Sequence, residues 1–206
     1  MSGPSTPRNH AAAARAAEMA KKTRKSRLIQ ASLWVGILLV VGAVVTAGLV
    51  TSRPDSSSDA RRAPDFTLST TAGTTVSLSQ FRGHPVLLYF NEGAGCDACT
   101  MQLAAIERDQ AAFDALDVEV LPIVMNTPEQ IQPDLDRFKV TTPVLIDDGT
   151  VSAAYDTLGK GMHAGLPGHS FVLIDASGTQ LWYGEYPSMW LDPAQLLSEI
   201  TTRLGA

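Results

Sequence analysis

The stretch YFNEGAGCDACTMQL, residues 89–103, contains both cysteines of the 206-residue chain. Cys96 and Cys99 follow a short apolar run at residues 84–90 and precede a segment rich in helix-forming residues. This order predicts a buried strand, a glycine-containing turn and a helix that begins at the cysteines. Residues three apart on a helix share a face, so the two sulfur atoms can meet.

A pair of cysteines at this spacing has three possible uses. As a staple it would close a very short loop and so add little stability. A closed zinc site needs four ligands, and the chain has no second Cys-x-x-Cys and no histidine placed to form a spaced ligand pair (its histidines are His10, His84, His163 and His169). We therefore predict redox chemistry, and a metal-binding or chaperone domain stays open as an alternative.

The two cysteines have different predicted roles. The positive end of the helix stabilises a thiolate at Cys96, which makes Cys96 the attacking sulfur. Cys99 would then resolve the mixed disulfide and leave a Cys96–Cys99 disulfide. Asp97 acts in the opposite direction, because a nearby negative charge raises the pKa of a thiol. A moderately activated Cys96 favours a reducing or mild exchange role, and since the sulfur atoms carry the electrons, neither an organic cofactor nor a metal is predicted.

The rest of this region alternates between strands and helices. Strands are expected at residues 84–90, 118–126 and 143–147, after a short strand and turn at 74–81, and a hairpin is expected at 170–186. Helices are expected at 99–116, at 127–138 with Pro133 starting a new turn, and at 192–204 with Asp192 as N-cap and Pro193 in the first position. The predicted fold class is α/β, with a central mixed β-sheet flanked by helices.

The N-terminal quarter has a different composition. Residues 1–27 are basic and polar, which predicts a disordered tail, and residues 28–50 carry no charge over a length that can cross a bilayer as one helix. A cleaved signal peptide is the alternative, although its apolar core is usually shorter. Residues 51–62 are interpreted as a polar linker, and residues 63–206 as the redox domain.

The charge distribution predicts how the membrane anchor is oriented in the bilayer. Residues 1–27 hold seven basic side chains and one acidic one, out of 16 Lys and Arg and 21 Asp and Glu in the whole chain. The basic flank of a membrane anchor stays in the cytoplasm, so a bacterial single-pass membrane protein with an extracytoplasmic redox domain is expected, in contact with the lipid bilayer through residues 28–50. The remainder of the chain is strongly acidic, which argues against nucleic acid as a partner.

Four stretches of the chain carry a family resemblance. They are APDFTLSTTAGTTVSLSQFRGHPVLLYF (63–90), CDAC (96–99), FKVTTPVLIDDGTVSAAYDTLG (138–159) and LPGHSFVLIDASGTQLWYGEY (166–186). Together they resemble the TlpA-like thiol–disulfide oxidoreductases and the related redoxin (AhpC/TSA-related) and peroxiredoxin families. The resemblance implies a thioredoxin-like fold and protein disulfides or thiols as substrates. It also implies a membrane thiol carrier as electron donor and a role in cytochrome c maturation or envelope redox homeostasis.

The resemblance also suggests residues around the sulfur atoms. Pro167 is the candidate for the cis-proline that shapes the substrate groove in such proteins, with an ordinary loop proline as the alternative. By their positions, Glu92 could relay a proton and His169 could tune the sulfur atoms; a solvated loop acid and a surface histidine are the alternatives. Gly95 stands where an aromatic residue is usual.

A peroxiredoxin-like thiol peroxidase, with Cys96 as the peroxidatic cysteine, is the second functional hypothesis. In the motif typical of that family, a proline and then a threonine or serine precede the reactive cysteine. The corresponding stretch here, NEGAGC at residues 91–96, has none of them. We therefore favour disulfide exchange over peroxide reduction at this stage.

Overall fold

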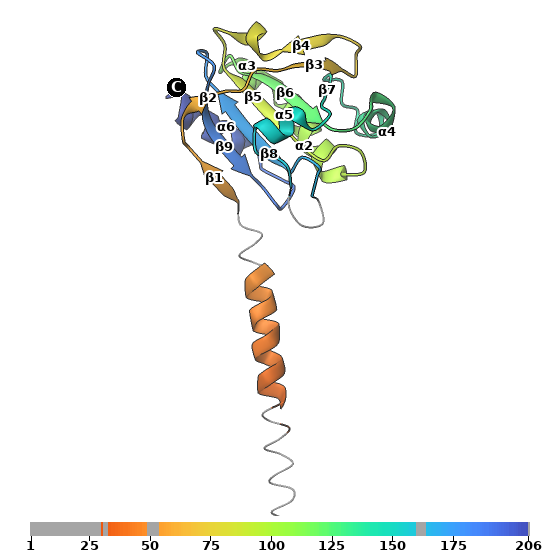
Figure 1. Cartoon of the computed structure of the whole chain (residues 1–206), viewed down its shortest axis with the longest axis vertical. Helices are drawn as coiled ribbons and strands as arrows, with labels where there is room; N and C mark the ends of the chain where they lie inside the picture. Colours follow the sequence, from red (N-terminus) through yellow and green to blue (C-terminus); the bar gives the residue numbers. More distant parts are fainter. Residues whose placement is uncertain (1–29, 31–32, 49–53, 160–163, 206) are drawn as a thin grey trace, which may run out of the picture. The chain divides into compact units, whose positions relative to one another are not determined.

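The computed structural model describes residues 30, 33–48, 54–159 and 164–205 (Figure 1). The chain divides into two compact units, Met1–Thr51 and Ser52–Ala206. In the first, residues 33–48 are helical and their side chains are exposed. Within the described part of the chain, no helix combines the length and the apolar character that crossing a membrane requires. The predicted segment 28–50 extends beyond this helix onto residues outside the described ones, where the predicted disordered tail also lies.

The second unit is built on one mixed sheet. Its described strands follow the order β1-β9-β8-β5-β6-β7-β3-β4, and β2 also pairs with β9. β5 and β7 run parallel to β6, whereas β8 is antiparallel to β5. The strands are β1 (Asp55–Ser57), β2 (Arg61–Arg62), β3 (Thr67–Thr70), β4 (Thr75–Ser77), β5 (Val86–Phe90), β6 (Glu119–Val124), β7 (Leu145–Ile146), β8 (Ser170–Ile174) and β9 (Thr179–Glu185). The predicted thioredoxin-like arrangement of a mixed sheet flanked by helices is confirmed.

Strand β5 lies in the middle of the sheet and is buried on both faces, as its uninterrupted apolar sequence predicts. Leu87 and Tyr89 point into one core with side chains of α2 (Asp97–Arg108), α3 (Gln110–Asp114), α4 (Pro128–Phe138) and α6 (Pro193–Leu204). Leu88 and Phe90 point into a second core with α5 (Thr150–Ala154) and the 3-10 helix η1 (Leu78–Phe81). The central strand is thus held from both sides, and it ends immediately before the cysteine loop.

The structure differs from the sequence prediction inside two helices. The helix expected at residues 99–116 is two helices, because α2 ends at Arg108 and α3 begins at Gln110. Pro133 was expected to start a new turn, but it lies inside α4. The buried side chains of Ile131 and Leu135 are four residues apart and keep this helix on the core across the proline.

Parts of the predicted polar linker, residues 51–62, pair with the sheet. Asp55–Ser57 and Arg61–Arg62 form short antiparallel strands on β9. The side chain of Arg61 donates a hydrogen bond to Gln180 Oε1 on β9 at 3.1 Å and forms an ion pair with Asp156 at 3.2 Å. Polar residues without hydrophobic periodicity can form such strands when the edge of an existing sheet supplies the hydrogen-bonding partners.

Candidate redox site

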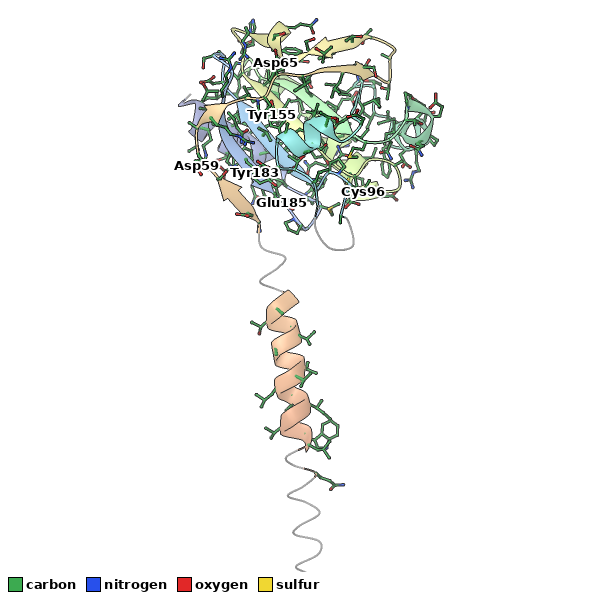
Figure 2. The ribbon with its side chains drawn as sticks, viewed as in Figure 1. Asp59, Asp65, Cys96, Tyr155, Tyr183 and Glu185 are labelled. Atoms are coloured by element: carbon green, nitrogen blue, oxygen red, sulfur yellow. A yellow bond between two sulfur atoms is a disulfide. The ribbon has the colours of Figure 1, made fainter. Side chains whose placement is uncertain are left out.

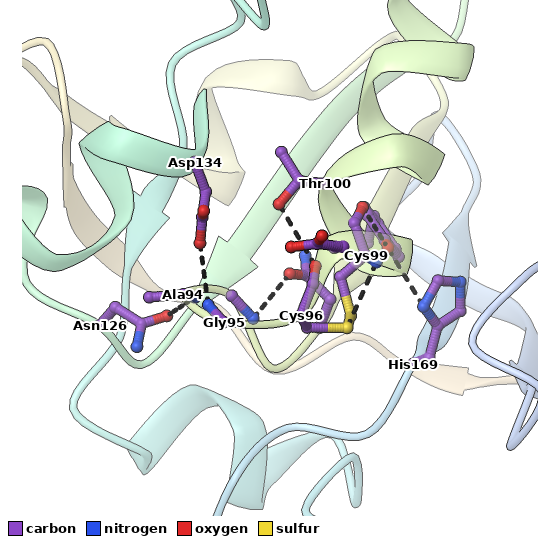
Figure 3. The surroundings of a disulfide bond; sticks show 12 residues. Ala94, Gly95, Cys96, Cys99, Thr100, Asn126, Asp134 and His169 are labelled. Carbon is purple, nitrogen blue, oxygen red and sulfur yellow. Dashed lines mark hydrogen bonds between the residues drawn. A yellow bond between two sulfur atoms is a disulfide. The ribbon is translucent and has the colours of Figure 1, made fainter. Parts of the chain in front are cut away.

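The two cysteines lie where β5 passes into α2. Cys96 is the N-cap residue of α2, Cys99 is in its first turn, and the Cys99 backbone N–H donates to the Cys96 Sγ atom at 3.3 Å. The predicted disulfide joins them, with the Cα atoms 5.3 Å apart (Figure 3). Cys96 is half-buried, whereas Cys99 is completely buried. Cys96 is therefore the more accessible residue of the bonded pair.

The loop before Cys96 is held by side chains from two other elements. Asn126, just after β6, accepts a hydrogen bond from the Ala94 N–H through Oδ1 at 2.9 Å. Gly93 has a positive φ of 73°, and a Cβ atom there would lie 1.8 Å from the same Oδ1 atom. Asp134 on α4 accepts a hydrogen bond from the Gly95 N–H at 2.8 Å. The glycines thus let the backbone turn closely against β6 and α4, and this fixes the approach to Cys96.

Asp97 is not an isolated negative charge. Its carboxylate accepts hydrogen bonds from both terminal nitrogens of Arg137, and the bond from Nη1 is 3.1 Å long. The hydrogen bond to Asp97 is the main reason that the pKa of Arg137 lies above its usual value. The sequence prediction considered the Asp97 carboxylate alone, whereas the structure pairs it with the Arg137 guanidinium group.

The buried side of the disulfide contains Tyr89 and His169. The Tyr89 hydroxyl group donates to the Cys99 backbone oxygen at 3.0 Å and lies 3.2 Å from Nδ1 of His169. Because the tyrosine proton is used toward Cys99, the Nδ1–H group of His169 is the donor to the Tyr89 oxygen, and Nε2 carries no proton in the neutral ring. The Nε2 atom is buried without a hydrogen-bond partner among the described residues.

Burial governs the protonation of both residues. It raises the pKa of Tyr89 well above its ordinary value and lowers the pKa of His169 to about 4. Both are therefore neutral near pH 7. His169 is only 1% exposed, so the alternative of a surface histidine is wrong. Figure 3 shows its ring beside the disulfide, and its tuning role stays a prediction.

The other predicted site residues lie in the flanking loops. Pro167 is buried and forms a β-bridge with Leu158. No peptide bond between described residues is cis, so the expectation of a cis-proline at Pro167 is wrong. Directly after this proline, the Gly168 N–H group donates a hydrogen bond of 2.7 Å to the Thr157 carbonyl oxygen. Glu92 is half-buried in the loop after β5, and its proton-relay role is untested.

The described residues also form a cavity away from the cysteine loop. A cavity of about 300 Å³ lies between the β1–β2 segment and β9, with Asp59, Tyr155 and Tyr183 among its lining residues. Figure 2 places these side chains away from Cys96. In the ranges that the structure describes, no three His, Cys, Asp or Glu side chains lie close enough together to hold a metal ion. The disulfide and its surroundings are therefore the candidate functional site.

Sequence reasoning missed the residues that support this site from outside the cysteine loop: Tyr89, Asn126, Asp134 and Arg137. One signal could have found Asn126. β5 and β6 are parallel neighbours, so the segments that follow them meet at one edge of the sheet. Asn126 and the start of α4 would then be expected beside the cysteine loop. The ion pair between Arg137 and Asp97 has no comparable signal in a single sequence.

This geometry agrees with comparisons to known proteins. The sequence profile of the AhpC/TSA family matches residues 60–179. The chain belongs to the AhpC/TSA family. The predicted resemblance to the redoxin (AhpC/TSA-related) family is thereby confirmed. Chloroplastic peroxiredoxin Q of Sedum lineare is 30% identical over 121 residues, which are 58% of this chain and 65% of that protein. The corresponding protein of Gentiana triflora is 29% identical over 58% of this chain and 56% of its own length. The match thus spans less than two thirds of either relative.

Solved structures support the fold of this AhpC/TSA domain. Peroxidoxin BcpB from Mycobacterium tuberculosis superimposes with a TM-score of 0.59 and 20% identity, over 70% of this chain and 95% of that structure. A solution structure described as a candidate protein disulfide isomerase from Bacteroides thetaiotaomicron gives a TM-score of 0.56 and 27% identity, over 71% of this chain and 89% of its own. A peroxidoxin and a candidate protein disulfide isomerase thus share this architecture, and the fold alone does not select between two such activities.

Proposed function

We propose that this AhpC/TSA-family protein is a dithiol oxidoreductase that exchanges disulfides with protein substrates. The observation that carries the proposal is the unequal exposure of the bonded pair, with Cys96 half-buried and Cys99 completely buried. An attacking thiolate must meet the substrate, whereas a resolving cysteine needs only to meet its neighbour. The half-buried Cys96 meets the first requirement, and the buried Cys99 meets the second.

The proposed reaction has two balanced steps. The Cys96 thiolate attacks one sulfur atom of a substrate disulfide, forming a mixed disulfide and releasing the other substrate sulfur as a thiolate that takes a proton from solvent. The Cys99 thiolate then attacks the Cys96 sulfur, releasing the second substrate thiolate and forming the Cys96–Cys99 disulfide. The substrate gains two electrons and the cysteine pair loses two. A thiol reductant must return them before the next cycle.

Peroxide reduction is the second candidate, because the chloroplastic relatives are named peroxiredoxin Q. In that reaction the Cys96 thiolate would attack a peroxide oxygen, breaking the O–O bond to form a sulfenic acid and to release water or an alcohol. The Cys99 thiolate would then attack the Cys96 sulfur, expelling the sulfenic oxygen as water and forming the same disulfide. Two side chains that could donate to a peroxide are already engaged. The Thr100 hydroxyl donates to the Cys96 backbone oxygen at 3.4 Å, and Arg137 is bonded to two carboxylates. Their engagement favours disulfide exchange.

One experiment distinguishes the two chemistries. The full-length Cys99→Ser variant is reduced, mixed with either a model protein disulfide or hydrogen peroxide, and followed by intact mass over seconds. Disulfide exchange predicts rapid accumulation of a mixed disulfide and slow oxidation by peroxide. Rapid sulfenic acid formation with little mixed disulfide would overturn the proposal in favour of a peroxidase. The Cys96→Ser variant is the control and should form neither product.

The location and partners remain part of the proposal. We infer that residues 28–50 hold the protein at a bacterial membrane, with residues 63–206 outside the cytoplasm and a membrane thiol carrier as the electron donor. The support is the charge-free length of this segment and the basic residues that precede it. Protease treatment of intact spheroplasts should digest the redox domain and spare the N-terminus. Complete protection of the redox domain in intact spheroplasts, with digestion after lysis, would reject this orientation.

A further inference from the structure

A cluster of three charged side chains connects α4 to the start of α2. The Arg137 guanidinium group lies between the carboxylates of Asp97 and Asp134. Its Nη1 atom donates to Asp97 Oδ2 at 3.1 Å, and its Nη2 atom donates to Asp134 Oδ1 at 2.9 Å and also to Asp97 Oδ1. The guanidinium group also lies 4.6 Å from the centre of the Phe138 ring, which packs against the core. Arg137 is therefore held in place by contacts on several sides.

This cluster reaches the chain on both sides of the proposed nucleophile. Asp97 directly follows Cys96. On the other side, Asp134 uses its Oδ2 atom to accept a hydrogen bond of 2.8 Å from the N–H group of Gly95, which directly precedes Cys96. Figure 3 shows Asp134 above the Gly95 backbone, in the same view as the disulfide. A single guanidinium group thus orders the two carboxylates that flank the reactive position.

We propose that Arg137 is a positioning residue that sets the stability of the Cys96 thiolate by neutralising Asp97. A carboxylate one residue away from a thiol disfavours the thiolate, and a bidentate guanidinium partner removes much of this repulsion. Without Arg137, the Asp97 charge would act on Cys96 directly. This inference deepens the proposed function, since it rests on Cys96 being the nucleophile of the exchange reaction.

Other groups near Cys96 act alongside this cluster. The N-terminal end of α2 contributes a positive potential that also favours the thiolate. Glu92 lies in the same loop, and His169 lies on the buried side of the disulfide. His169 is neutral near pH 7 because burial lowers its pKa. Of these groups, only Arg137 provides a positive side-chain charge that is bonded directly to the residue after Cys96.

The test measures the pKa of Cys96 in the reduced full-length protein with Cys99→Ser, using the ultraviolet absorbance of the thiolate. Arg137→Met should raise the Cys96 pKa by up to about 0.7, the size appropriate to an exposed ion pair. Arg137→Lys should have a smaller effect, because an ammonium group keeps the charge but cannot pair in a bidentate manner. High salt should reduce the difference between Arg137→Met and the parent.

A double-mutant cycle decides whether Arg137 acts through Asp97. In an Asp97→Asn background, Arg137→Met should raise the Cys96 pKa clearly less than in the parent, because only Asp134 then remains to be neutralised. An equal increase in both backgrounds would overturn the proposal, since Arg137 would then act directly or by holding the loop. No increase in either background would overturn it as well. Asp97→Asn and Arg137→Lys keep the test decisive if Arg137→Met fails to fold.

This measurement is independent of substrate. If the Cys96 pKa follows the cycle but no mixed disulfide forms, the inference about Arg137 holds and disulfide exchange fails. If mixed disulfides form and the pKa does not respond, the proposed function holds and the role of Arg137 fails.

Discussion

The hydroxyl group of Tyr89 donates a hydrogen bond of 3.0 Å to the backbone carbonyl of Cys99. The central strand of the sheet is thereby connected directly to the buried half of the redox pair. The same hydroxyl oxygen accepts the N–H of His169, so three residues from three segments form one buried polar group. The Tyr89 ring also stacks on Phe171, with centroids 4.8 Å apart.

Removing this hydroxyl group should destabilise the protein. Tyr89→Phe deletes the bond to Cys99 and leaves the Nδ1–H group of His169 buried without an acceptor. We expect the free energy of unfolding to fall by roughly 1–3 kcal/mol, measured by urea denaturation of the oxidised protein. Tyr183→Phe is the control, because that hydroxyl donates to Glu185 at 3.2 Å in a partly exposed setting, where water can take the place of the lost hydroxyl group. Equal losses for the two variants would contradict the importance of the buried group.

The loop before Cys96 offers a matched pair of glycine substitutions. Gly93 and Gly95 both have positive φ values, 73° and 87°, but only at Gly93 would a Cβ atom collide with Asn126. Gly95→Ala should cost about 1–2 kcal/mol for the left-handed backbone alone. Gly93→Ala should cost roughly 2–4 kcal/mol, since it also displaces the acceptor of the Ala94 N–H. Thermal or urea unfolding of both variants tests this order, and a larger loss at Gly95 would refute it.

Chemical labelling should report the difference in exposure between the cysteines. In the reduced protein, iodoacetamide should modify Cys96 on the order of tenfold or more faster than Cys99, because Cys99 is completely buried. Peptide mass mapping at short reaction times measures the two rates. Labelling in denaturant should remove the difference and serves as the control. Comparable rates under native conditions would mean that reduction exposes Cys99.

The buried His169 predicts a specific loss of stability in acid. Its pKa is lowered to about 4 in the folded protein, whereas a histidine in the unfolded chain has a pKa of about 6.5. The unfolded state therefore binds a proton that the folded state excludes, and stability is lost as the pH falls from about 6.5 toward about 4. The contribution is about 3 kcal/mol across this range.

The substitution His169→Asn isolates this contribution. An asparagine can still donate to the Tyr89 oxygen but does not titrate. We expect urea unfolding of His169→Asn to show a smaller drop in stability between neutral and acidic pH than the parent protein shows. Carboxylates titrate in the same range and contribute to both proteins, so the difference between the two slopes is the relevant quantity. Identical slopes would show that His169 is accessible to protons in the folded state.

Much of this architecture could be predicted from the sequence, for identifiable reasons. The apolar run at 86–90, the hairpin around Ser177-Gly178 and the Asp192-Pro193 helix start are local signals, and the structure has all three. The position of the cysteines at a strand-to-helix junction follows from the same local patterns. The unequal burial of Cys96 and Cys99 follows once the helix is placed on the sheet.

The remaining features depend on contacts between distant segments. Asp134 is 39 residues from the Gly95 that it binds, and Arg137 is 40 residues from Asp97. Asp97 was predicted to act alone because a single sequence does not show which cation lies opposite it. The prediction that Pro133 starts a new turn failed because the burial of Ile131 and Leu135 stabilises the helix more than the proline destabilises it. Local rules fail at these points because tertiary contacts decide the outcome.

The short strands β1 and β2 protect a vulnerable edge. They cover Tyr183–Glu185 and Thr179–Gln180 of β9, the two ends of a strand whose backbone would otherwise face solvent. A chain shortened to begin at residue 63, where hydrophobic patterning places the domain boundary, would lack both strands. Its open β9 edge could then pair with the same edge of another molecule and seed aggregation. Residues 55–62, which the sequence suggests are only a spacer, thus also protect the redox domain from self-association through β9.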